Sequence, residues 1–342
     1  MNDKIEGRAS VAGDKESSGV NSPASGARLH LSPNQKAWRR FKRNRLAVVS
    51  ALFLAGIIAL ALAWPLFSVP EITSHLPKAM TWSPLALTDA QYAPPGGGHW
   101  FGTDVHGRDL LSRVFYGARI SLLVGVVGAG VSLIIGVLWG AIAGYVGDRW
   151  DNVMMRIVDI LYSLPSIVFV IVLIAVLEES FKASLTRLFS SEAGAVANML
   201  LLFAGLGAVS WLTMARIVRG QVLSLRTRAF VDASRALGAS HARILLKHIL
   251  PNVYGVIIVY LTLTVPAIIL YESFLSYLGL GIQPPQASLG YLIADGAAAI
   301  NPIRVYWWLI VFPGITLAST LFALNFLGDG LRDAWDPRAV NE

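Results

Sequence analysis

Few side chains in this sequence have types and spacing that suit chemistry, and the metal-capable ones gather in one short segment. This segment contains His99, Asp104, His106 and Asp109. Their spacing matches no standard metal site, so we interpret the segment as a loop scaffold and expect no metal there. The sequence contains no cysteine, which excludes disulfide bonds, thiolate metal sites and cysteine nucleophiles.

The familiar catalytic and nucleotide-binding motifs are absent. The sequence lacks the phosphate-binding pattern GxxxxGK(S/T), the zinc-protease pattern HExxH, the nucleophile pattern GxSxG and the EF-hand pattern. If this protein uses energy from ATP, another chain must therefore supply it.

Two acidic residues lie near the ends of the membrane spans predicted below. Asp159 is about one turn inside the third span, and Glu272 is just past the end of the fifth. Ion-coupled carriers need ionisable groups deep in the membrane, whereas both of these lie near its surface. A hydrogen-bonded or inter-subunit pair would explain each residue. The functional alternative makes them gate or substrate-path residues, with Glu272 on the outer side.

A polar, basic island at residues 226–252 interrupts an otherwise apolar sequence. Residues 229–237 predict a short helix with Phe230, Ala233 and Leu237 on one face. Gly238 stands where the end of a helix commonly takes a left-handed residue.

A second short helix is predicted after that glycine. Ser240 is a suitable N-cap, and Pro251 is expected to end the helix. Its apolar stripe consists of Ile244, Leu245 and Ile249. Two short helices joined at a glycine in this way are suited to docking in a groove on a partner protein. The alternative is a basic loop that lies on anionic lipid headgroups.

The elements that position these residues are predicted membrane spans. Hydrophobic residues make up 55% of the chain and charged residues 14%, and the mean hydropathy is +0.58. These values are typical of a polytopic membrane protein. Apolar runs predict spans at residues 46–67, 120–146, 157–177, 194–215, 253–271 and 305–327. The predicted fold class is therefore an all-α polytopic membrane protein with six transmembrane helices.

The distribution of lysine and arginine predicts the orientation. The segment KAWRRFKRNR precedes the first span, and the linker that holds the island is also rich in arginine. The linkers on the opposite side carry few basic residues, so we expect both termini and the island to be cytoplasmic. The net charge of +7 then reports orientation and contact with membrane lipids rather than binding of nucleic acid.

Small residues and prolines mark several predicted spans. The second span carries glycines at four-residue spacing, which are Gly136, Gly140 and Gly144. We interpret them as a face for close packing within this subunit. Three later spans contain prolines that permit kinks, which are Pro165, Pro266 and Pro313.

The segment before the second span is predicted to be an amphipathic helix on the outer surface. Its apolar face would comprise Leu110, Leu111, Val114, Phe115 and Ala118. The chain then divides into a disordered cytoplasmic tail (1–35), a basic anchor with the first transmembrane helix (36–67) and an extracytoplasmic linker (68–118). A core of five transmembrane helices (119–328), which includes the island, and a cytoplasmic C-terminal tail (329–342) follow.

The island resembles the EAA loop of permease subunits from binding-protein-dependent ABC importers. In DASRALG and the later LPN, the matching positions are Asp232, Ala233 and Ser234 at the opening, Gly238 at the glycine, and Leu250 and Pro251 at the close. The generic pattern begins Glu-Ala-Ala, so Asp232 and Ser234 depart from it, and His248 replaces the usual isoleucine. The resemblance implies that these matching residues, together with Arg235, couple the permease to an ATPase.

Three other stretches resemble the C-type permease of dipeptide and oligopeptide importers. They are FGTDVHGRDLLSRVFYGARISL, YESFLSYLGLG at residues 271–281 and FALNFLGDGLRDAWDPR at residues 322–338. Together with the island, the likeness extends over nearly all of residues 36–338. It implies a type I ABC importer permease fold with cytoplasmic coupling helices, in a bacterial inner membrane.

The resemblance also implies partners. They are a second, B-type permease, two cytoplasmic ABC ATPase subunits that bind ATP and Mg²⁺, and an extracytoplasmic solute-binding protein. This chain would hold no cofactor and would catalyse no covalent step. The implied cargo is di- and oligopeptides; closely similar permeases carry nickel, glutathione or microcin-like peptides. The alternatives of another class are an ion-coupled secondary transporter or channel and a non-transporting membrane anchor.

Overall fold

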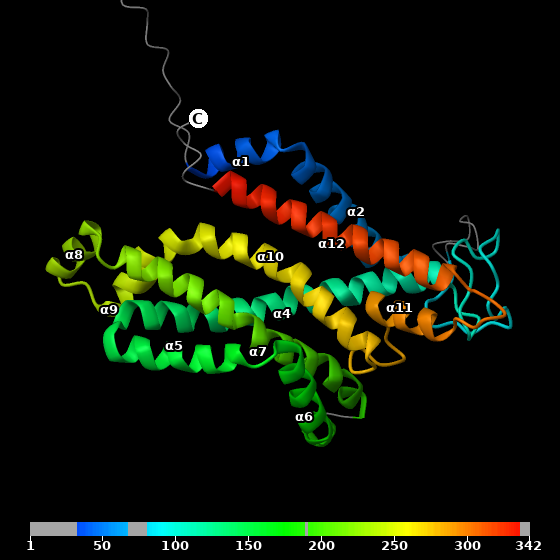
Figure 1. Cartoon of the computed structure of the whole chain (residues 1–342). Helices are drawn as coiled ribbons and strands as arrows, with labels where there is room; N and C mark the ends of the chain where they lie inside the picture. The colour runs from blue at the N-terminus through cyan, green and yellow to red at the C-terminus, as the bar shows by residue number, and fades with distance from the viewer. Residues whose placement is uncertain (1–32, 68–80, 189–190, 336–342) are drawn as a thin grey trace, which may run out of the picture.

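The computed structural model describes residues 33–67, 81–188 and 191–335, and the regular elements in these ranges are helices (Figure 1). In chain order they are α1 (Pro33–Arg43), α2 (Arg45–Phe67), α4 (Leu110–Val146), α5 (Asp148–Ser163), α6 (Ser166–Leu188), α7 (Ser191–Leu225), α8 (Ala229–Ala236), α9 (His241–Arg243), the π-helical turn η2 (Ile244–Ile249), α10 (Leu250–Tyr277), α11 (Leu289–Ala298) and α12 (Trp308–Trp335). The predicted N-terminal tail, part of the outer linker and the end of the C-terminal tail fall largely outside the described residues.

The long helices confirm the predicted class of fold. Five helical segments are long and apolar enough to cross a membrane, and a sixth crossing results if α5 and α6 count as one broken span. The main core lies where α4, α7 and α10 pack together, with α11 and α12 against its outer half. In Figure 1 the island with α8 and α9 occupies one end of the molecule, and the loop at residues 81–109, called the outer loop below, occupies the other end with α11.

The predicted third span is broken rather than straight. Helix α5 ends at Ser163, α6 begins at Ser166, and the two are bent by 88°. Leu164 has extended dihedral angles at the break, as expected for a residue that precedes proline. The prediction that Pro165 permits a kink is thus confirmed, and the predicted third span at residues 157–177 lies across the break between α5 and α6.

The predicted amphipathic surface helix is the first part of α4. This helix runs without interruption from Leu110 to Val146, and its side chains Leu110, Ser112 and Val114 are buried. Leu110 and Val114 belong to a core cluster that also contains Leu289 of α11. The prediction of a separate helix on the outer surface is therefore wrong, because the apolar face packs against other parts of the protein.

The glycine face of α4 packs against α7, as the sequence predicts. A Cβ atom at Gly136 would lie 2.6 Å from the Cβ of Met214, and one at Gly144 would lie 2.8 Å from the carbonyl oxygen of Arg219. At Gly140 the added atom would overlap the backbone of Ala215. Close approach of the two backbones therefore requires glycine at these positions.

Candidate functional site

The first half of the island forms the predicted helix and glycine turn. Helix α8 ends at Ala236, and Gly238 has a φ of 76°, in the left-handed region. The Gly238 N–H donates to the carbonyl of Arg235 (2.9 Å), and the Ala239 N–H donates to that of Ser234 (3.0 Å). These are the two hydrogen bonds of a Schellman motif, so the chain reverses in a fixed geometry.

The second half of the island is helical but does not stop at the proline. Ser240 caps α9, its Oγ accepting a hydrogen bond from the Arg243 N–H (3.4 Å). The chain then passes through η2 into α10, where Pro251 lies in the first turn. The prediction that Pro251 ends the helix is wrong. A proline in a first turn has no N–H to leave unpaired, and the π-helical turn before it absorbs the change of register.

Packing divides the apolar side chains of the island into two groups. Ile244 and Ile249 are fully buried, and they pack in one cluster with Val231 of α8 and with residues of α7. The predicted face of α8 is exposed instead: Phe230 is 40% exposed and Leu237 is 88% exposed. The buried residues Val231, Ile244 and Ile249 fix α8 to the bundle. Phe230 and Leu237 form an exposed apolar surface that a partner could contact.

The polar residues of α8 lie on the same exposed unit. Asp232, Ala233 and Arg235 are exposed and Ser234 is half-buried. Arg235 donates to Asp232 (3.1 Å), and both side chains are exposed. A surface pair of this kind contributes about 0–1 kcal/mol, so these charges are available to another protein.

The C-terminal end of α4 contacts the chain on both sides of α8. The Tyr145 hydroxyl lies 2.8 Å from Nδ1 of His241. Before α8, Arg226 donates to the carbonyl oxygens of Gly144 (3.3 Å) and Tyr145 (3.4 Å). A movement of the island would therefore pull directly on a membrane-spanning helix.

Asp159 lies on α5 and pairs with α7. Its carboxylate accepts a hydrogen bond from Arg216 (2.7 Å), and that guanidinium lies over the ring of Tyr162 at 4.1 Å. One turn further along α7, Arg219 makes two bonds to Asp151 (2.5 and 2.6 Å). The interpretation that Asp159 belongs to a hydrogen-bonded pair is thus confirmed, and both residues of the pair lie in this chain. Its arginine partner was not identified from sequence because the two residues lie far apart along it.

Glu272 lies inside α10, which continues to Tyr277, so its predicted position beyond the span is wrong. Its side chain is fully buried. It accepts hydrogen bonds from Ser276 (2.6 Å) and from Ser121 of α4 (3.4 Å). Ser121 in turn accepts from the Leu289 N–H (3.1 Å) at the start of α11. Glu272 therefore joins α10, α4 and α11 through hydrogen bonds that involve serine side chains. In the sequence, the signal for this role is the occurrence of serine residues within apolar runs.

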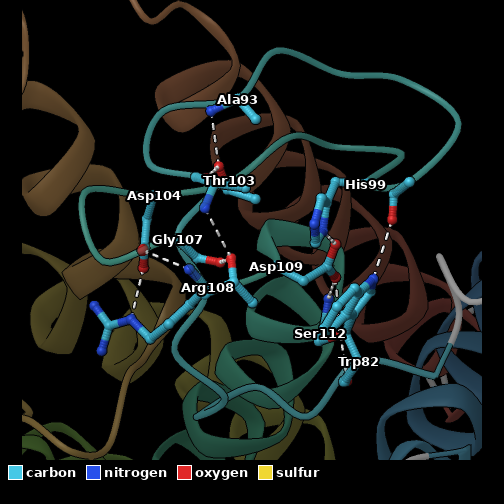
Figure 2. A network of polar contacts seen from close by, with 12 residues as sticks. Trp82, Ala93, His99, Thr103, Asp104, Gly107, Arg108, Asp109 and Ser112 are labelled. Atoms are coloured by element: carbon cyan, nitrogen blue, oxygen red, sulfur yellow. Dashed lines mark hydrogen bonds and ion pairs between the residues drawn. The ribbon is translucent and has the colours of Figure 1, made fainter.

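The outer loop is organised around two buried aspartates (Figure 2). Asp104 accepts hydrogen bonds from the His106 N–H (2.8 Å) and from the N–H (3.0 Å) and Nε (2.7 Å) of Arg108. It also forms an ion pair with Arg113 of α4. Burial by itself would raise the pKa of the Asp104 carboxyl, but the Arg113 guanidinium and the bonds from Arg108 outweigh burial and hold this pKa below its ordinary value.

Asp109 anchors the start of α4. Its carboxylate accepts from the Ser112 N–H (2.8 Å) as the N-cap and contacts Nδ1 of His99 (2.9 Å). Ser112 Oγ also donates to the carbonyl of Trp82 (2.7 Å), and Figure 2 shows these side chains gathered beside the helix end. Both aspartates thus serve the loop scaffold that the sequence predicts. Within the described ranges, no three His, Cys, Asp or Glu side chains form a group that could hold a metal ion.

These features together define a multi-pass helical membrane protein. The family model described as "Binding-protein-dependent transport system inner membrane component" matches residues 136–341. A second model, "N-terminal TM domain of oligopeptide transport permease C", matches residues 32–95. The chain therefore belongs to the family of binding-protein-dependent transport system inner membrane components, as its resemblance to that family predicts.

Individual relatives extend this similarity along the chain. The oligopeptide transport system permease protein OppC of Escherichia coli (strain K12) is 46% identical over 304 residues, covering 89% of this chain and 91% of the relative. The dipeptide transport system permease protein DppC of Bacillus subtilis (strain 168) is 41% identical over 318 residues, covering 91% and 88%. Among solved structures, the inward-facing MetNI methionine ABC transporter matches with a TM-score of 0.48 and 21% identity, over 68% of this chain and 98% of that one.

Proposed function

We propose that this chain is the C-type permease subunit of an ATP-driven importer and forms half of a translocation path for di- and oligopeptides. The observation that carries this proposal is the island, in which a rigid helix and glycine turn present Phe230 and Leu237 to solvent. Similar proteins named as oligopeptide and dipeptide permeases support the choice of cargo.

In the complex that we propose, this chain binds four other subunits. They are a second, B-type permease, two cytoplasmic ATPases that hold ATP and Mg²⁺, and an extracytoplasmic binding protein that delivers the peptide. The exposed face of α8 docks in a groove on one ATPase. Closure of the ATPases then moves the island, and the island moves α4 through Tyr145 and Arg226. The chain itself catalyses no reaction and holds no cofactor.

We place the protein in the bacterial cytoplasmic membrane with both termini in the cytoplasm. The support is the positive charge at the end of α1, where Arg40, Lys42 and Arg43 precede the first span, and the arginines of the island. This orientation puts α8 on the side where ATP is available and the outer loop on the side where a binding protein delivers cargo.

The function can be tested by reconstituting the chain in liposomes with its second permease, ATPases and binding protein. We expect a labelled tripeptide to accumulate only when ATP and the binding protein are both present. Nickel and glutathione serve as competing cargoes, and preferential uptake of either would replace the peptide assignment. Uptake driven by a proton gradient without the ATPases would contradict the proposal and favour an ion-coupled carrier.

A further inference from the structure

A cavity of about 340 Å³ lies between α5, α6, α7 and α10. Its lining includes the hydroxyl side chains Tyr162, Ser166, Thr213, Tyr260, Thr264 and Tyr271. Ser210 adds a further hydroxyl group, the remaining lining residues are apolar, and none of the lining side chains is charged. The cavity therefore offers hydrogen bonds and aromatic surface without a fixed charge that would trap a charged ligand.

The break between α5 and α6 opens onto this cavity. Leu164 and Ser166, on either side of Pro165, both line it. The end of one helix and the start of the next leave backbone carbonyl and N–H groups without intrahelical partners. Within a membrane, such irregular backbone is tolerated where it is buried in protein or lines a water-filled space. This break is therefore better suited to a polar cavity than to a surface in contact with lipid.

A second hollow lies nearer the end of the molecule that carries the island. It is lined by Asn152, Arg156, Asp159, Arg216 and Arg219, and its volume is about 690 Å³. Tyr162 separates the two spaces, since it lines the cavity and stacks under Arg216 of the second hollow. A polar, charged space thus lies beside the cavity, on the side that we assign to the cytoplasm.

Its size limits what the cavity can hold. Pockets for small ligands have volumes of about 300–1,000 Å³, so this one is near the lower limit and too small for a whole oligopeptide. We propose that the cavity is a subsite for one apolar or aromatic side chain of a peptide in transit, with the rest of the peptide lying outside it. This inference rests on the proposed function and assigns to it residues that contact the cargo.

Filling the cavity should change the selectivity between peptides. We expect Thr264→Trp to lower uptake of alanyl-phenylalanyl-alanine by about tenfold or more, the range that hydrophobic pockets achieve, and to leave tri-alanine uptake within about twofold. Equal effects on both peptides, or no effect on either, would overturn the inference and leave the proposed function standing. A wild-type complex that imports neither peptide would overturn both.

A second measurement does not depend on how the larger residue packs. Because the sequence contains no cysteine, Thr264→Cys introduces a single thiol. We expect a water-soluble thiol reagent to label this variant and alanyl-phenylalanyl-alanine to slow the labelling during turnover with ATP and binding protein. Leu270→Cys is the matched control, because Leu270 lies on the same helix, is 56% exposed and does not line the cavity. Labelling of T264C that this peptide does not slow, or equal labelling of both variants, would contradict the subsite.

Discussion

Gly238 fixes the direction in which the chain leaves α8, and glycine is needed there for its backbone conformation rather than for lack of space. A Cβ atom there would meet no atom within 4 Å, but the φ of 76° is unfavourable for a residue with a branched side chain. A substitution should therefore act through the geometry of the turn and leave the packing of the bundle unchanged.

We expect Gly238→Val to leave the protein in the membrane and to uncouple ATP hydrolysis from peptide uptake. The reason is a strain of about 1 kcal/mol or more at the positive φ, which would displace α8. Gly238→Asn is the control, because asparagine tolerates this conformation, and it should retain coupling. The measurement is the ratio of peptide taken up to ATP hydrolysed in liposomes. A normal ratio for the valine variant would refute the role of the turn.

At the outer end, the charge of Asp104 should matter for stability. We expect Asp104→Asn to be destabilising by about 3–5 kcal/mol, because it leaves Arg113 buried with only the longer contact to Asp295 at 3.5 Å. Thermal inactivation in detergent would measure the loss. Adding Arg113→Met should restore part of it, since the two substitutions are coupled; strictly additive losses would contradict the pairing.

The same carboxyl predicts a dependence of stability on pH. Its pKa is held below the ordinary value in the folded protein, so the ionised form stabilises the fold. This contribution is fully present above the unfolded-state pKa of about 3.9 and is lost as the pH falls from there through the folded pKa. The stability of the wild type should therefore fall more steeply below pH ~4 than that of Asp104→Asn. Parallel pH profiles for the two proteins would contradict this assignment.

Among the elements, α4 connects the two ends of the molecule and depends on close packing against α7. We expect Gly140→Leu to be destabilising by about 1–3 kcal/mol or to prevent folding, because the added side chain overlaps the backbone of Ala215. Gly130→Leu is the control on the same helix, since an added Cβ there meets nothing within 4 Å. Melting temperatures in detergent would test this, and equal values for the two variants would refute the packing argument.

Two prolines show why the ends of elements are harder to predict than the elements. Pro165 breaks its helix because Leu164 is extended, whereas Pro251 lies in the first turn of α10 after a π-helical turn. The same residue type therefore has opposite effects, and the difference depends on the backbone that precedes it. Spans could be predicted from apolar runs, but the register of η2 is set by the packing of Ile244 and Ile249.

For the whole molecule, the fold and the island were largely predictable from sequence, and the contacts across the bundle were not. The island has local signals, namely Gly238 for the turn and Ser240 for the cap. The serine partners of Glu272 and the pair of Asp159 with Arg216 join segments far apart in the sequence. Such pairs depend on how the helices pack, which a single sequence does not display.

At the scale of the whole molecule, the central claim is that α8 is the element of this chain that binds the ATPase. The most direct test is Leu237→Asp, which replaces an exposed apolar side chain with a charge. Ile303→Asp is the control, because Ile303 is 91% exposed and lies in the segment between α11 and α12, away from the island. The measurement is recovery of the ATPase subunits with the affinity-purified permease. We predict loss of the ATPases for Leu237→Asp and normal recovery for Ile303→Asp; normal recovery for both would contradict the claim.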